Sequence, residues 1–221
     1  MTPRVHVGTP YTSVLVPRFL EVLKEPGPKR VALSGGRTPR ELFSLLATDY
    51  RDRVPWDRLA LFQVDERCVP PDHADSNWRH IRETILDVVP DVEAHRMRAE
   101  EPGAADDYDV LLRQLLPRDA AGVPVFDIVL LGLGPDGHTA SLFPDTEALT
   151  VTDRFVVRNA VPQLDTERIT LTYPALNAAR HRWFILRGAD RRRVFEEVRA
   201  GQHPAVCIRD PEWFVEPDVV G

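Results

Sequence analysis

The sequence predicts an α/β protein of three layers, a mostly parallel open sheet with helices on both faces. Short apolar segments alternate along the chain with segments of helical periodicity. Two of the apolar segments run directly into glycine-rich turns, at Gly35-Gly36 and at Gly132 to Gly137, as strands of such sheets do. No break in composition divides the 221 residues, so we expect a single domain over residues 1–221.

The first predicted helix covers residues 12–24, which carry regularly spaced apolar side chains. Thr12 or Ser13 can cap its start, although Pro17 makes the start position ambiguous because proline fits only the first turn of a helix. A turn at residues 26–28 then leads to a strand at residues 30–33.

The next helix is predicted to begin at Thr38, directly after the strand and Gly35-Gly36. Thr38 serves as N-cap, Pro39 occupies the first helical position and Glu41 completes a capping box. Free backbone N–H groups and the positive end of the helix dipole would meet at this turn, which favours an anion site. An ordinary tight turn between strand and helix is the alternative, and the motif is not a Walker loop.

A strand at residues 59–64 ends in the charged residues Asp65, Glu66 and Arg67. These side chains lie at the same sheet edge as Gly35-Gly36 or, alternatively, belong to a solvated loop. Residues 75–77 then cap a helix whose inner side carries Trp78, and a further helix covers residues 104–116.

Residues 127–144 read DIVLLGLGPDGHTASLFP and are the most informative stretch of the chain. A buried strand at residues 128–131 leads into the glycine turn, which presents Asp136 and His138, and Thr139 and Ser141 are expected to start a helix. The remaining predicted strands cover residues 155–157, 168–172, 182–186 and 206–208, with helices at 174–179 and 191–198.

The composition excludes several classes of protein. The formal net charge of -6 argues against a broad nucleic-acid surface. The only lysines, Lys24 and Lys29, lie outside every motif, which counts against imine chemistry. Cys68 and Cys207 form neither a disulfide framework nor a metal motif. The first ten residues lack the apolar core of a secretory signal and no run reaches membrane-spanning length, so we expect a cytoplasmic protein.

The glycine turn allows several interpretations. Its G-x-G-x-x-G spacing fits a dinucleotide site, but Pro135 removes an N–H and Asp153, the acid at the right separation, precedes a strand instead of ending it. The histidines show no metal-binding spacing, and no G-x-S-x-G nucleophile motif is present. His138 therefore remains either a structural residue or a general base that acts without a cofactor.

Four segments together resemble the 6-phosphogluconolactonase family, within the superfamily that includes glucosamine-6-phosphate deaminase/isomerase. They are LSGGRTPRELF (33–43), VDERCVPPDHADSNW (64–78), LLGLGPDGHTASLFP (130–144) and RITLTYPALNAAR (168–180). The resemblance implies a modified Rossmann-like fold and an enzyme of the oxidative pentose phosphate pathway. Such an enzyme hydrolyses 6-phospho-D-glucono-1,5-lactone to 6-phospho-D-gluconate, and needs neither metal nor cofactor.

The resemblance also implies roles for individual residues. His138 is expected to deprotonate the attacking water and Asp136 to orient the site, while Asp65 corresponds to the superfamily's catalytic aspartate. Nearby backbone N–H groups or Arg67 would stabilise the oxyanion, and Gly134 is expected to bind the substrate. The residues expected to hold the phosphate are Ser34, Gly35, Gly36, Arg168 and Arg191, the last standing where the family commonly has a lysine.

Two alternatives remain within this resemblance. A deaminase would carry a glutamate at the position of Phe143, which cannot transfer a proton. A non-catalytic sugar-phosphate sensor is the other alternative, but the chain has no added helix-turn-helix segment. The expected partner is a phosphosugar lactone, without nucleic acid or membrane, and the expected state is a monomer or a weak homodimer.

Overall fold

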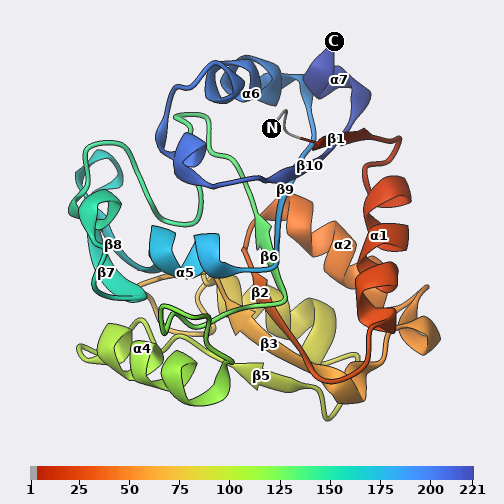
Figure 1. The fold of residues 1–221 in the computed structure, drawn as a ribbon, viewed down its shortest axis with the longest axis horizontal. Coiled ribbons are helices and arrows are strands. Elements are labelled where there is room, and N and C mark those ends of the chain that lie inside the picture. The colour runs from red at the N-terminus through yellow and green to blue at the C-terminus, as the bar shows by residue number, and fades with distance from the viewer. Residues whose placement is uncertain (1–3) are drawn as a thin grey trace.

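The computed structural model describes residues 4–221 and is organised around a parallel sheet of seven strands (Figure 1). The strands are β1 (Arg4–Val7), β2 (Lys29–Leu33), β3 (Leu59–Gln63), β5 (Glu93–His95), β6 (Ile128–Leu131), β9 (His181–Leu186) and β10 (Glu212–Val215). Their order across the sheet is β1-β10-β9-β6-β2-β3-β5, and all neighbouring pairs run parallel. The predicted mostly parallel α/β sheet is therefore confirmed.

Helices cover both faces of this sheet, because both faces of its central strands are apolar. Val31 and Leu33 of β2 pack with one set of helices, while Ala32, which points the opposite way, packs with the other. The first set is α1 (Thr12–Lys24), α2 (Arg37–Ala47) and α3 (Asn77–Ile81), which continues as a π-helical turn over Arg82–Leu86. The second set is α4 (Ala104–Leu115), α5 (Tyr173–Ala178), α6 (Arg192–Arg199) and α7 (Pro217–Val220).

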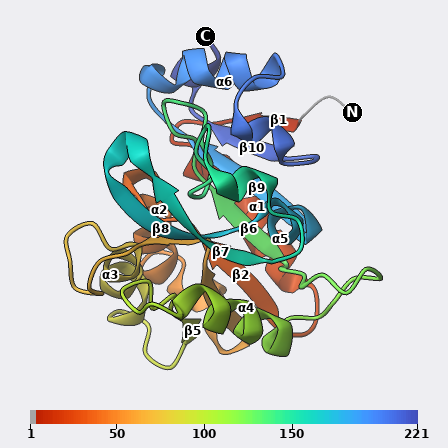
Figure 2. The same ribbon diagram turned by 90° about the vertical axis from the view of Figure 1, so that its left-hand side faces the viewer.

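A second, antiparallel sheet lies on the α4 side of the main sheet (Figure 2). It contains β4 (Asp65–Arg67), β7 (Val156–Val161) and β8 (Thr166–Leu171), in the order β4-β8-β7. The tight connection between β7 and β8, with Asp165 in the left-handed conformation, forces these two strands to be antiparallel. Residues 65–67 are thus a strand that leaves the main sheet, and the expectation of a solvated loop there is wrong.

The expected helix caps are also corrected. Gly36 precedes α2, and neither Thr38 nor Glu41 forms the capping box, since Glu41 forms an ion pair with Arg187 instead. No side chain caps α1 either, whose first turn follows Tyr11. Ser76 does cap α3 as expected, with its side chain accepting a hydrogen bond from the amide of Arg79.

Two further expectations fail, and two strands were not predicted, because tertiary contacts determine the structure of these segments. Thr139 and Ser141 start no helix: residues 139–142 form a turn, and the next helical turn covers Glu147–Thr150. Residues 206–208 form no strand, since Pro204–Cys207 is a 3-10 turn. The last strand is β10, which is inserted between β1 and β9 and was not predicted, nor was β1.

Candidate active site

The candidate site lies at the carboxyl ends of β2, β3 and β6, where the chain leaves the sheet in three neighbouring loops. Adjacent strands of a parallel sheet end at the same edge, which is the usual place for a ligand. A cavity of about 270 Å³ opens there. It is lined by Ser34, Gly35, Gly36, Asp65, Arg67, Asn77, Gly132, Leu133, Gly134, Pro135, His138, Ala140, Arg168 and Arg191.

His138 and Asp136 form a hydrogen-bonded pair beside this cavity. The Nδ1 atom of His138 lies 2.5 Å from the Oδ1 atom of Asp136. Because a carboxylate only accepts hydrogen bonds, we assign the proton to Nδ1, which leaves Nε2 free to accept a proton. Burial raises the pKa of Asp136, but the hydrogen bond and charge of His138 outweigh it and the net pKa lies below the ordinary value. Asp136 is therefore ionised at neutral pH and orients the imidazole.

Phe143 supports the same imidazole from its face. The two ring centroids are 3.9 Å apart and the ring planes differ by 25°. The Cζ atom of Arg168 also lies 5.4 Å from the centre of the Phe143 ring. This buried phenylalanine thus contacts both a candidate base and a candidate phosphate-binding residue.

Gly134 holds the turn together. Its amide donates to the carbonyl oxygen of His138 at 2.8 Å, so this N–H is already engaged. A side chain at position 134 would collide with the His138 ring, since a Cβ atom there would lie 2.1 Å from Nδ1. The structure therefore gives Gly134 a packing reason to be glycine, and Gly134 lines the cavity in which a substrate contact is expected.

Asp65 projects from β4 and is almost fully buried. Its Oδ2 atom accepts a hydrogen bond from the hydroxyl of Ser141 at 2.7 Å, and the side-chain amide of Asn77 donates to the Asp65 backbone oxygen at 2.9 Å. Ser141 thus orients the carboxylate of Asp65 instead of capping a helix. The two partners keep the carboxylate at a defined place on the cavity wall.

Arg67 and Arg168 lie directly opposite each other on the paired strands β4 and β8. Each has a buried Nε atom without a hydrogen-bond partner in residues 4–221. Burial and the charge of Arg67 lower the pKa of Arg168, as expected when two cations are held together. Neither guanidinium forms an ion pair within residues 4–221, and two such groups at one cavity wall favour an anionic ligand.

The glycine turn after β2 supplies further donors on the opposite wall. The Ser34 hydroxyl is buried and has no partner in the part of the chain that the structure describes. The amides of Gly36 and Arg37 precede or begin α2, where backbone N–H groups have no acceptor within the helix. Ser34 and Gly36 line the same cavity as the arginines, an arrangement suited to phosphate, whereas Arg37 lines the adjoining larger cavity.

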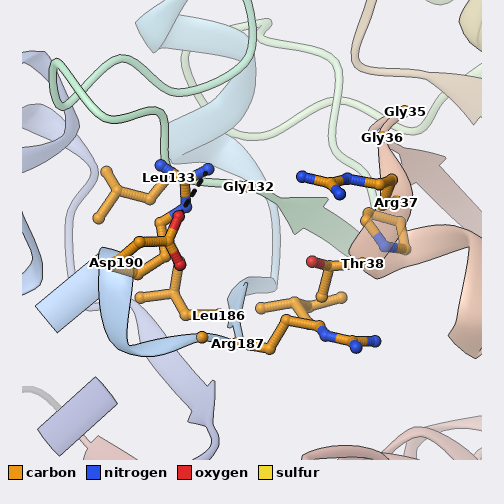
Figure 3. A pocket seen from close by; sticks show the side chains of 13 residues that line it. Gly35, Gly36, Arg37, Thr38, Gly132, Leu133, Leu186, Arg187 and Asp190 are labelled. Atoms are coloured by element: carbon orange, nitrogen blue, oxygen red, sulfur yellow. Dashed lines mark ion pairs between the residues drawn. The ribbon is translucent and has the colours of Figure 1, made fainter. Parts of the chain in front are cut away.

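Arg191 lies where this cavity meets a larger one of about 530 Å³ (Figure 3). Arg37 and Thr38 line one side of the larger cavity, and Leu133, Leu186 and Asp190 line the other. Arg191 forms an ion pair with Asp190, with 3.6 Å between the charged groups. The two cavities share Gly35, Gly36, Gly132, Leu133 and Arg191 in their walls and together form one cleft.

The structure brings every predicted site residue to this cleft, with Asp136 reaching it through His138. Sequence reasoning missed Asn77, which it treated only as part of a helix cap, and Glu66, which accepts hydrogen bonds from the amides of Asn77 and Trp78. The only signal for Asn77 was its place in the segment that carries Asp65.

No cluster of three or more metal-ligating side chains occurs in residues 4–221. Over the same residues, no helix has both the length and the apolar character needed to span a bilayer.

The fold and the cleft together are typical of an α/β enzyme that acts on a small phosphorylated ligand. Residues 10–218 match the family model described as glucosamine-6-phosphate isomerases/6-phosphogluconolactonase, and the chain belongs to this family.

Named relatives agree with this assignment. A 6-phosphogluconolactonase of Synechocystis is 39% identical over 206 residues, covering 90% of this chain and 82% of the relative. A 6-phosphogluconolactonase of Nostoc is 37% identical over 223 residues, covering 94% of this chain and 89% of the relative. The solved 6-phosphogluconolactonase of Trypanosoma brucei superimposes with a TM-score of 0.87 at 27% identity, covering 98% of this chain and 97% of the other.

Proposed function

We propose that this chain hydrolyses 6-phospho-D-glucono-1,5-lactone to 6-phospho-D-gluconate, a step of the oxidative pentose phosphate pathway, with water activated by His138. The observation that carries the catalytic part is the Asp136–His138 pair, which leaves Nε2 as the proton acceptor beside a cavity lined by Arg67 and Arg168, each with an unpartnered buried Nε atom in residues 4–221. The chain's membership of the family and the names of its relatives support the proposed substrate. We expect the enzyme to act in the cytoplasm as a monomer or a weak homodimer.

The reaction needs one base and one site for negative charge. Nε2 of His138 takes a proton from water while the water oxygen bonds to the lactone carbonyl carbon. The negative charge then developing on the carbonyl oxygen is stabilised by Arg67, which projects from β4 into the cavity. As the carbonyl re-forms, the bond to the ring oxygen breaks and the ring oxygen receives the proton from His138. The product acid then ionises in water.

The phosphate occupies the donor-rich part of the cleft. Ser34, the Gly35-Gly36 turn and Arg168 surround one part of the cavity, and Arg191 lies at its junction with the larger cavity. Asp65, held by Ser141 and Asn77, is an acceptor for a ring hydroxyl of the sugar. The lactone is thereby held with its carbonyl toward His138.

Phe143 favours lactone hydrolysis over sugar-phosphate deamination. A deaminase carries a proton-transferring glutamate at this position, whereas here a benzyl ring is stacked on His138. The ring offers no proton for opening a sugar ring or releasing ammonia. Hydrolysis by a single base is the chemistry that these side chains can perform.

Hydrolysis of enzymatically generated lactone, measured against the spontaneous rate, tests the proposal. We expect His138→Ala to lower kcat about 10²- to 10⁴-fold, the usual contribution of a positioned base. His73→Ala is the matched control, because His73 also lies beside an aspartate two residues away but outside the cleft, and it should leave kcat unchanged. Equal rates for wild type and His138→Ala would refute the base. A chain that binds 6-phosphogluconate without accelerating hydrolysis would be a sensor.

A further inference from the structure

Phe143 contacts two groups that the proposed reaction uses, although its side chain has no chemistry of its own. It is 2% exposed, and its ring is stacked on the His138 imidazole at 3.9 Å. The guanidinium carbon of Arg168 lies 5.4 Å from the same ring centroid. His138 follows β6, whereas Arg168 belongs to β8 of the other sheet, so the ring joins the two halves of the site.

The stack completes the orientation of the base. The hydrogen bond from Nδ1 to Asp136 anchors one edge of the imidazole. The stacked ring of Phe143 at 3.9 Å packs against its face and further limits rotation about the Cβ–Cγ bond, which helps to define the direction of Nε2. A general base acts only within hydrogen-bond reach of its proton, so this orientation contributes directly to the rate.

The same ring positions Arg168. This guanidinium has an unpartnered buried Nε atom in the described chain and faces Arg67 across the strand pair, which tends to push it away. A cation over an aromatic face is attracted by the ring's quadrupole, which offsets part of that repulsion. Before any anion binds, Phe143 is therefore one of the contacts that keeps Arg168 in the cavity.

We propose that Phe143 is a positioning residue that holds the base and the phosphate-binding arginine in a fixed arrangement, matched to a phosphorylated lactone. The inference rests on the proposed function and adds a specificity element to it. Removal of the ring should impair base orientation for every lactone, and arginine placement only for lactones that carry a phosphate. The two effects can be separated by the choice of substrate.

The test compares Phe143→Leu with wild type on 6-phosphogluconolactone and on unphosphorylated glucono-1,5-lactone. Each lost ring contact corresponds to about a fivefold effect. We expect kcat/KM to fall about fivefold for the unphosphorylated lactone and about 25-fold for the phosphorylated one. Phe143→Met, a second variant without an aromatic ring, should show the same losses of kcat/KM. It takes the place of Phe143→Leu in the assay if the leucine variant unfolds at the assay temperature.

Phe155→Leu is the matched control. Phe155 is also buried, with the Cζ atom of Arg113 lying 4.2 Å from its ring centre, but it is outside the cleft. This variant should lose stability without changing the ratio of the two kcat/KM values. Equal losses on both lactones in Phe143→Leu, or no loss on either, would overturn the inference.

A spectroscopic measurement separates this inference from the proposed function. The ring current of Phe143 should shift the imidazole proton signals of His138 upfield, and Phe143→Leu should abolish that shift whether or not the lactone is the substrate. An unchanged signal would refute the stacking role, whereas a wild-type protein without lactone hydrolysis would refute the proposed function alone.

Discussion

Gly35 and Asn77 are in such close contact that only glycine fits at position 35. A Cβ atom there would lie 1.7 Å from Oδ1 of Asn77 and 2.2 Å from its Cγ. Asn77 cannot simply move away, because its side-chain amide donates to Asp65 and its backbone amide donates to Glu66. The requirement for glycine here is steric, whereas Gly36 has a φ of +102° and is needed for its backbone conformation.

We expect Gly35→Ala to lower the free energy of unfolding by about 1–3 kcal/mol, the usual cost of overpacking a well-packed site. Gly132→Ala is the control, because it lies in the same cavity wall but has no heavy atom within 4 Å of its added Cβ. That variant should remain within about 0.5 kcal/mol of wild type in urea unfolding. Similar stabilities of the two variants would contradict the packing argument.

Individual residues of the candidate site could be chosen from the sequence because they follow the ends of predicted strands. Parallel strands end at one edge, so Gly35, Asp65 and His138 could be placed together without knowledge of their contacts. The contacts themselves could not be predicted. Ser141 reaches Asp65 across 76 positions of the chain only because β4 leaves the main sheet, and no local pattern marks that departure.

The segment from β4 to α3 is organised by Glu66, a buried carboxylate with five hydrogen-bond donors. The side chains of Gln63 and Ser76 donate to it, as do the amides of Arg67, Asn77 and Trp78. The carboxylate thereby ties the end of β3 to the start of α3. The positions of Asp65, Arg67 and Asn77 in the cleft all depend on this connection.

Glu66→Gln should therefore destabilise the protein far more than loss of the adjacent helix cap. A glutamine offers one acceptor oxygen and turns an NH₂ group toward donors, so several buried donors lose their partner. We expect a loss of about 3 kcal/mol or more, against about 1 kcal/mol for Ser76→Ala, which removes the cap of α3. Urea unfolding at neutral pH measures both, and a Glu66→Gln variant as stable as Ser76→Ala would disprove the central role of Glu66.

For helices and strands, hydrophobic periodicity predicted most of the elements, and the errors have physical causes. Helix α4 ends at Leu115, one residue before its predicted end, and Leu115 is 41% exposed there. Strands β1 and β10 have four residues each, and β10 is held between β1 and β9, so neither strand shows a strong pattern alone. The antiparallel sheet was not foreseen because its strand β4 consists of three charged residues, and the contact of Asp65 with Ser141 is distant in sequence.

The two ends of the main sheet serve different purposes in the whole molecule. The carboxyl ends of its strands carry the cleft, while the amino ends of β1, β9 and β10 converge on Glu212, which is 3% exposed. Its carboxylate is contacted by Arg4, His6, Arg18, His181 and the indole N–H of Trp183. This cluster attaches the N-terminal strand and α1 to the sheet far from the cleft.

The cluster makes stability depend on pH. The hydrogen bond with His181 and the charges of Arg18 and Arg4, together with the Trp183 N–H, outweigh burial and hold the pKa of Glu212 well below its ordinary value. A carboxyl group whose pKa is lower in the folded state stabilises the fold fully above its unfolded pKa of about 4.3. That contribution is lost as the pH falls from there toward the folded-state pKa.

Glu212→Gln should accordingly lower the free energy of unfolding by about 1.5–3 kcal/mol at pH 7, because the hydrogen bonds to the buried carboxylate lose their charge and Arg4 and Arg18 lose their counter-charge. The difference from wild type should shrink as the pH is lowered below about 4, where the wild-type carboxylate also loses its advantage. Since Glu212 lies at the end of the sheet opposite the cleft, kcat/KM of the folded variant at 25 °C should equal that of wild type. Urea unfolding across pH 3–7, combined with lactone hydrolysis at neutral pH, measures both quantities. A stability difference independent of pH, or a loss of activity without unfolding, would show that the two ends of the sheet are coupled.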